Sequence, residues 1–205
     1  MKNENESDQT FQNRSKQLER SMARFKHTPL SNSTESSEEI SKLIDLNDFE
    51  ELSAVFNQAT GLGVSCFDAS FNLIANSGWQ KICSRFHKQH PEAHQACSET
   101  LTHFKKHLSA EGPISYKCKN GLWDLAYPLL FEGKILGCLI FGQFFYQHDP
   151  VDKHFFVEQA KKYQFEKDAY IGVLKEVPII SQEKLEAYIE LFVTSLEKTI
   201  QLRLH

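Results

Sequence analysis

Residues 118–145 read CKNGLWDLAYPLLFEGKILGCLIFGQFF and contain two apolar runs, at 122–131 and 134–145. Both runs are rich in aromatic and aliphatic residues and carry little charge. The connection between them is short and is centred on Gly133, which predicts a β-hairpin. Runs of this composition are typical of strands with at least one well-buried face.

Three glycines lie in or beside these runs: Gly121, Gly137 and Gly142. Glycine inside a strand often marks a bulge, or a point where a ligand or another backbone comes close. The stretch therefore predicts a curved sheet with a pocket on its concave side.

The composition indicates a soluble, core-forming chain of 205 residues, with 40% hydrophobic and 24% charged residues. A net charge of −4 gives no reason to expect direct contact with nucleic acid. No apolar run approaches the roughly 20 residues of a membrane-spanning helix, and the N-terminus has no secretory signal. We expect a cytoplasmic protein whose five cysteines are reduced.

The chain divides into a polar segment at 1–41 and a folded domain at 42–205. We expect the first segment to be a disordered tail with a linker over 29–39. Its few apolar residues are spaced so that an amphipathic helix over 10–26 is the alternative.

Hydrophobic periodicity predicts the elements of the folded part. A helix over 48–61 starts from a cap at Asn47, with Glu50 three residues on, and ends at Gly61 and Gly63. Two short strands follow around the turn at Asp68.

Helical spacing returns after the second strand, and Pro91 is suited to the first turn of a long helix. A strand at 114–120 leads into the hairpin, and helices follow at 149–163 and 166–177. A final helix starts from Ser181. The order predicts an α+β fold with one antiparallel sheet.

Several motifs occur in order and at compatible spacings: Trp79, Ile82-Cys83, Cys97, Cys118 to Leu122, Asp124, Pro128, Gly137 and Phe141-Gly142-Gln143. With these motifs the chain resembles the PocR sensory domain, over roughly residues 43–202. Such domains occur in bacterial and archaeal transcription regulators and sensor kinases.

The resemblance implies a PAS-like antiparallel β-sheet with flanking helices and a long C-terminal helix. It also implies a small-molecule ligand, such as a short diol, and a signal passed through the terminal helix. No output module follows that helix in this sequence. We therefore expect a signalling partner protein, unless the chain is a fragment.

The predicted pocket is lined by rings and a few polar groups, as ligand pockets usually are. The candidate ligand-binding residues are Trp79, Asn120, Trp123, Asp124, Tyr127, Phe141 and Gln143, with Phe67 and Phe144 as further rings. In the alternative interpretation the rings are simply core and Asp124 caps a strand end.

Cys83, Cys97 and Cys118 have three interpretations: buried packing, ligands of zinc or an iron–sulfur cluster, or redox-sensing thiols. A fourth ligand would be Cys138, His87 or His94. Cys66 is expected in the core.

Other histidines, His90, His103 and His107, are expected on a solvated face. The sequence has no nucleophile elbow, phosphate loop or His-Glu-x-x-His motif, so we do not expect an enzyme.

The final predicted helix has an apolar stripe that includes Leu185, Ile189, Phe192 and Leu196. This stripe could form a homodimer or dock onto the sheet of its own domain.

Overall fold

The computed structural model describes residues 36–131, 134–149 and 151–203. Six strands form a sheet in the order β2-β1-β5-β4-β3, with β6 beside β5. The strands are β1 Gly63–Asp68, β2 Leu73–Ser77, β3 Ile114–Lys117, β4 Trp123–Phe131, β5 Lys134–Tyr146 and β6 Ile179–Ile180. The helices are α2 Ser36–Leu43, α3 Leu46–Thr60, α4 Lys81–Arg85, the 3-10 helix η1 His87–Gln89, α5 Pro91–His107, α6 Lys153–Lys162, α7 Lys167–Leu174 and α8 Gln182–Arg203.

The predicted hairpin is confirmed. β4 and β5 pair antiparallel from Trp123 opposite Phe144 to Phe131 opposite Lys134. β1, β2 and β3 also pair antiparallel with their neighbours, as an α+β fold with a PAS-like sheet requires. Among the strands that the structure describes, only β6 runs parallel to its neighbour, β5, and this two-residue strand is too short to give a sequence signal.

Helix α3 starts two residues earlier than predicted, because Asp45 and not Asn47 is its cap. The Asp45 carboxylate accepts hydrogen bonds from the backbone N–H groups of Asn47 and Asp48, which satisfies donors in the first turn. Gly61 ends the helix with a φ of 77°, as predicted. Gly63 is instead the first residue of β1.

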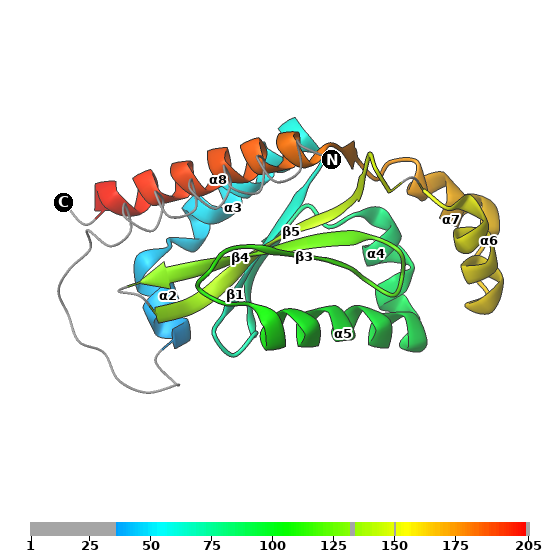
Figure 1. Ribbon diagram of the computed structural model, residues 1–205, viewed down its shortest axis with the longest axis horizontal. Coiled ribbons are helices and arrows are strands. Elements are labelled where there is room, and N and C mark those ends of the chain that lie inside the picture. The colour runs from blue at the N-terminus through cyan, green and yellow to red at the C-terminus, as the bar shows by residue number, and fades with distance from the viewer. Residues whose placement is uncertain (1–35, 132–133, 150, 204–205) are drawn as a thin grey trace.

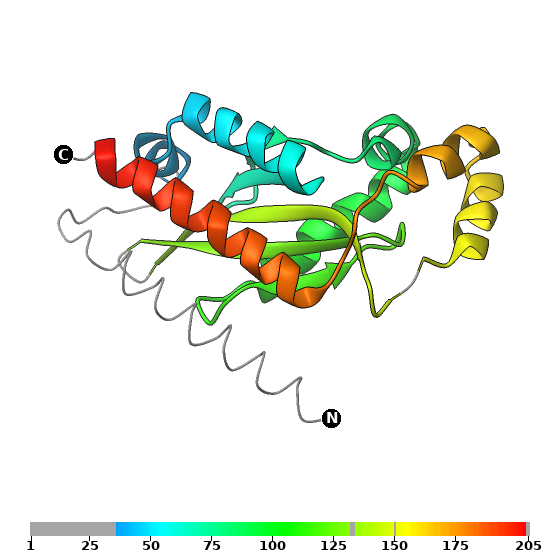
Figure 2. The ribbon, with the colours of Figure 1, turned by 90° about the horizontal axis from the view of Figure 1, so that it is seen from above.

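The helices form two layers around the sheet. α3 and α8 cover one face, and α5 with α4 lies against the other (Figure 1). Figure 2 shows α3 and α8 lying across the same face, while α6 and α7 extend beyond one end of the sheet. The sheet thus separates the core beneath α3 and α8 from the face that α5 covers.

The apolar stripe of α8 docks onto the chain's own domain. Leu185, Ile189, Phe192 and Leu196 are each 3% exposed or less. The ring of Phe192 lies 5.1 Å from that of Phe56 and 5.5 Å from that of Phe141, centroid to centroid. These four side chains therefore pack in the core of their own domain. The cap at Ser181 is confirmed, since its hydroxyl accepts from the Lys184 N–H at 3.2 Å.

Helix α2 extends the packed domain toward the N-terminus. It begins at Ser36, and its Ile40 is 1% exposed in the core. The linker predicted over 29–39 is therefore wrong for its last four residues. The predicted tail and the alternative helix over 10–26 lie outside the described residues.

Among the helices that the structure describes, none combines the length and the apolar character needed to cross a membrane.

Candidate functional site

A cavity of about 310 Å³ lies between the sheet and helices α4 and α5. Rings and aliphatic side chains provide most of the surface of its wall, which also contains seven polar side chains and three thiols. Its lining comprises Phe67, Phe71, Leu73, Trp79, Leu101, Phe104, Ile140, Ser65, Lys88, His94, Ser98, Thr100, Asp124, Gln143, Cys83, Cys97 and Cys118. Its volume lies at the low end of the range for ligand pockets, so it is suited to a small molecule.

A β-bulge places the side chain of Gln143 in this cavity, beside Asp124. Asp124 pairs with Gly142, and Trp123 pairs with Phe144, so Gln143 is an extra residue without a partner in the register. The bulge directs Gln143 into the cavity, whereas Phe144 packs in the core beneath α8. Bulges commonly re-aim a side chain beside a functional site.

Asp124 is 6% exposed, and its Oδ1 accepts a hydrogen bond from Gln143 Nε2 at 3.4 Å. Burial disfavours the carboxylate and raises the pKa of Asp124 to about 7. Gly142 leaves the space for this carboxyl group, because a Cβ there would meet Asp124 Oδ1. The result is an acid that can donate or accept a proton near neutral pH.

Trp79 is held at the cavity wall by a hydrogen bond from its indole Nε1 to Ser65 Oγ at 2.8 Å. The ammonium group of Lys88 lies over the indole ring, a cation–π contact. Burial lowers the pKa of Lys88. Gln80, which follows Trp79 in the sequence, donates its backbone N–H to Gln143 Oε1 at 3.2 Å. This hydrogen bond links the wall at Trp79 to the bulge.

The structure brings Cys83, Cys97 and Cys118 to one cavity, as the metal hypothesis requires. Burial raises the pKa of all three thiols, that of Cys118 to about 12. In the described part of the chain, no group of three or more His, Cys, Asp or Glu side chains is arranged to hold a metal ion. The metal interpretation therefore stays a prediction, and the neutral thiols form part of the cavity wall.

A buried polar chain runs from this wall to α6 and α7; it consists of Cys83, His87, Tyr170, Gln159, Asn120 and Cys97. The backbone carbonyl of Ala93 can only accept a hydrogen bond, so it fixes which groups donate and which accept along this chain. Asn120 Nδ2 donates to this carbonyl at 2.8 Å and to Cys97 Sγ at 3.2 Å. Its Oδ1 is left to accept from Gln159 Nε2 at 3.1 Å.

The donors and acceptors in the rest of the chain follow from this orientation of the Asn120 amide. Gln159 Oε1 accepts from the hydroxyl of Tyr170, whose only hydrogen is thereby used. His87 Nε2 must then donate to the Tyr170 oxygen, at 2.7 Å. His87 Nδ1 is left as an acceptor, 3.8 Å from Cys83 Sγ. Burial lowers the pKa of His87 to about 4, which is consistent with this neutral ring.

Three of the seven predicted ligand-binding residues line the cavity: Trp79, Asp124 and Gln143. Phe67 also does. Asn120 does not, because both ends of its amide are used in the buried polar chain.

Trp123, Tyr127 and Phe141 lie on the opposite face of the sheet, packed in or against the core beneath α8, as does Phe144. Alternation along β4 explains this, since Trp123 and Tyr127 point away from the face that carries Asp124. The expectation that all seven residues form one pocket is thus corrected.

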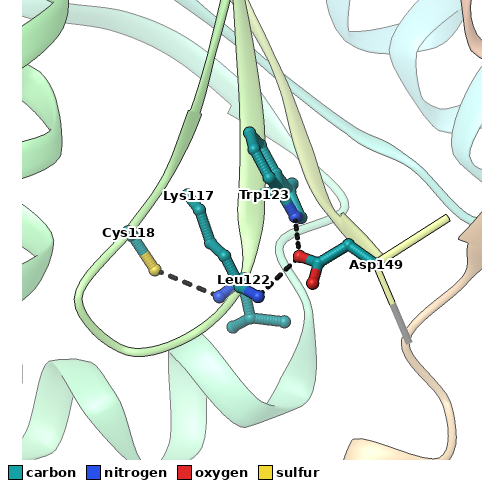
Figure 3. A network of polar contacts seen from close by, with 5 residues as sticks. All are labelled: Lys117, Cys118, Leu122, Trp123 and Asp149. Atoms are coloured by element: carbon teal, nitrogen blue, oxygen red, sulfur yellow. Dashed lines mark hydrogen bonds and ion pairs between the residues drawn. The ribbon is translucent and has the colours of Figure 1, made fainter. Parts of the chain in front are cut away.

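Trp123 instead takes part in a clamp at the sheet edge (Figure 3). Asp149 Oδ2 accepts from Trp123 Nε1 at 2.7 Å and from Lys117 Nζ at 2.5 Å. These bonds lower the pKa of Asp149. In the adjoining turn, the Leu122 N–H donates to Cys118 Sγ at 3.4 Å. The clamp fixes the loop that presents Cys118 to the cavity.

The histidines have separate roles. His87 belongs to the buried polar chain, and His94 lines the cavity. His107 is exposed, as expected. His90 and His103 are half-buried, with their rings 4.8 Å from Tyr163 and 4.0 Å from Tyr116, so neither lies on an open solvated face. Cys66 is 1% exposed in the core, as predicted.

Thr100 and Lys88 also line the cavity, and neither was predicted to do so. Thr100 is 5% exposed on α5, next to Leu101 in the stripe that faces the sheet. The helical spacing from Cys97 through Leu101 to Phe104 could have identified this face.

Residues 42–204 match the family model described as "Sensory domain found in PocR". No curated protein and no solved structure matches the chain.

Proposed function

Because the chain belongs to the family of PocR sensory domains, we propose that the cavity beside α5 binds a small ligand derived from a hydrocarbon. The observation that carries this proposal is a buried, hydrogen-bonded Asp124 in an otherwise mostly apolar cavity. Gln143 donates to Oδ1 of this carboxyl group, which has further hydrogen-bonding sites that are unfavourable to leave unpaired in such a place. A ligand hydroxyl would pair with one of them.

The lining supports a short-chain alcohol or diol. Phe67, Leu101 and Ile140 would pack against the carbon chain, and Asp124 would bind a hydroxyl group. Leaving a buried hydroxyl unpaired costs about 1–3 kcal/mol, so Asp124 and Gln143 would fix the orientation of the ligand. We propose no reaction at this site; the cavity serves binding.

The bulge offers a route from the cavity to α8. Gln143 lines the cavity, and its neighbours Phe141 and Phe144 lie in the core on the other face. Phe141 contacts Phe192 of α8, with ring centroids 5.5 Å apart. A ligand that moves Gln143 would thus change the packing of α8, and α8 would pass this change to a regulatory output or partner protein. The ligand shifts this equilibrium only by its difference in affinity for the two states.

Thermal unfolding with a panel of short diols and alcohols tests the proposal. A ligand of the native state raises the melting temperature in a concentration-dependent way. We expect at least one panel compound to stabilise the wild type, and Asp124→Ala to remove the effect. Absence of stabilisation by every compound at saturating concentration would contradict the proposal.

A second candidate function is a metal or iron–sulfur redox sensor. It is favoured by one observation, the position of Cys83, Cys97 and Cys118 on the same cavity. Elemental analysis and a visible spectrum of protein purified without oxygen decide between the two. Stoichiometric zinc or iron that is lost in the triple Cys→Ser variant would favour this second function.

A further inference from the structure

Three exposed aliphatic side chains lie on the outer sides of α3 and α8, the helices that cover one face of the sheet. Val55 on α3 is 60% exposed, and Leu191 on α8 is 62% exposed. Leu202, in the last turn of α8, is 81% exposed. The inner sides of both helices already pack in the core. Exposed apolar residues that gather on one surface often mark a protein–protein contact.

Ring contacts show that α3 and α8 lie side by side and run in opposite directions (Figure 2). Phe49 of α3 lies 6.0 Å from Phe192 of α8, and Phe56 of α3 lies 6.4 Å from Tyr188 of α8, centroid to centroid. The start of α3 is therefore beside the C-terminal half of α8. Because the helices are in contact along this length, their exposed side chains border one continuous surface, the α3–α8 face.

The α3–α8 face carries opposite charges on its two halves. The exposed side chains on the α3 half are Glu50, Glu51, Ala54, Val55 and Gln58. Those on the α8 half recur at helical spacing and are Lys184, Ala187, Leu191, Lys198 and Leu202. Among the residues that the structure describes, these two glutamates and two lysines make no ion pair. One half is thus acidic and apolar, and the other is basic and apolar.

A second copy of the chain is complementary to such a face. In a two-fold interface the same patch meets itself, so each half contacts the opposite half of the other copy. With the two-fold axis parallel to the helices, α3 would pack on α8 of the partner subunit. Glu51 would then face the partner's Lys198, and Val55 would face the partner's Leu191, because α3 and α8 are antiparallel within one chain. Charge pairs around an apolar contact fix its register.

We propose that the chain forms a homodimer through the α3–α8 face. The predicted dimer stripe on the inner side of α8 is buried in its own domain, so the dimer uses the outer side of the same helix. Leu191 on that outer side is next to Phe192, whose ring lies 5.5 Å from that of Phe141, centroid to centroid. This inference goes beyond ligand binding, because it gives α8 a second chain on which to act.

Sedimentation velocity of the full chain over a series of concentrations tests the proposal. We expect a concentration-dependent dimer. Leu191→Glu and Val55→Glu should each raise its dissociation constant by roughly tenfold or more, because each places a charge against apolar surface. Ile179→Glu is the matched control, since Ile179 is 60% exposed but belongs to β6, outside the α3–α8 face. This variant should dimerise like the wild type.

A charge exchange tests the arrangement of the two halves. Glu51→Lys and Lys198→Glu should each weaken the dimer by roughly threefold to tenfold, because each places like charges opposite one another. The double variant should recover the dissociation constant of the wild type, since every pair is restored with its signs exchanged. Glu111→Lys, an exposed change in the loop after α5, is the control and should have no effect.

Two results would overturn the homodimer. One is a dimer that Leu191→Glu and Val55→Glu leave unchanged, which would place the interface elsewhere. The other is a wild type that stays monomeric at every concentration. If Leu191→Glu also lowers the melting temperature of that monomer, the face is covered within the chain and not by a second copy. Neither result bears on the proposed function, because sedimentation of the free protein requires no ligand.

Discussion

The Nε2 atom of His87 donates a hydrogen bond to the hydroxyl oxygen of Tyr170, at a distance of 2.7 Å and with both side chains fully buried. These residues are 83 positions apart in the sequence. Their contact joins the segment after α4 to α7 and places the cavity wall in one hydrogen-bonded unit with α6 and α7. Buried networks of this kind specify a unique arrangement only when every member is satisfied.

Removal of the Tyr170 hydroxyl should therefore destabilise the domain. Tyr170→Phe leaves His87 Nε2 and Gln159 Oε1 without their partner, at about 1–3 kcal/mol for each group. Chemical denaturation measures the change in the free energy of unfolding. Tyr188→Phe on α8 is the control, since the Tyr188 hydroxyl makes no hydrogen bond to any described residue, and it should change stability by less than about 0.5 kcal/mol. Equal stability of the two variants would contradict the buried polar chain.

The neutral state of His87 predicts sensitivity to acid. Its pKa falls from 6.5 to about 4 in the folded protein because burial disfavours the charged ring. The unfolded chain thus binds more protons between these values. The contribution of His87 to stability is present above pH 6.5 and is lost as the pH falls toward 4. An NMR titration should find the His87 ring neutral at pH 5.5; a charged His87 ring at that pH would refute this assignment.

The raised pKa of Asp124 predicts the opposite dependence of stability on pH. Its pKa rises from 3.8 to about 7 on folding, so the folded state binds more protons between pH 4 and 7. Its contribution to stability is largest below pH 4 and is lost as the pH rises through 7. Between pH 4 and 8 the free energy of unfolding of the wild type should fall by on the order of 2–4 kcal/mol more than that of Asp124→Asn, because the asparagine carries no charge. Parallel pH profiles for the two proteins would show that Asp124 is ionised throughout.

Glycine at position 142 should be required by the carboxyl group of Asp124. A Cβ at this position would meet Asp124 Oδ1, so Gly142→Ala should cost about 1–3 kcal/mol of unfolding free energy and impair ligand binding. Gly172→Ala on α7 is the matched control, because nothing lies within 4 Å of the added Cβ. That change should stabilise the helix by about 0.5–1 kcal/mol. A tolerated alanine at position 142 would mean that the bulge is less closely packed than described.

Local patterns predicted the elements well. The apolar runs on either side of Gly133 identified β4 and β5, and helical spacing from Leu185 to Leu196 identified α8. These signals are local, because each depends on residues within one element. The cap at Asp45 was missed in favour of Asn47, since both residue types suit that role and only the hydrogen bonds distinguish them.

Only part of the candidate site was predicted. The sequence shows which polar groups are unusual, but it does not show which of them lie on the same face of the sheet. Trp123 and Asp124 are adjacent and must point to opposite faces of β4, a separation that strict alternation could have revealed. Gln143 reaches the cavity only through the bulge opposite Asp124. The partnership of Asn120 with Gln159 joins segments 39 residues apart, and no local pattern predicts it.

The proposal that the cavity binds a small ligand is tested most directly by an NMR titration of the two tryptophan indole N–H signals. Trp79 lines the cavity, and Trp123 is bonded to Asp149 at the sheet edge, so the chain contains its own control. Titration with a short diol should shift the Trp79 signal in a saturable way and leave that of Trp123 nearly unchanged. An unmoved Trp79 signal at saturating concentrations of every short diol and alcohol would contradict ligand binding in this cavity.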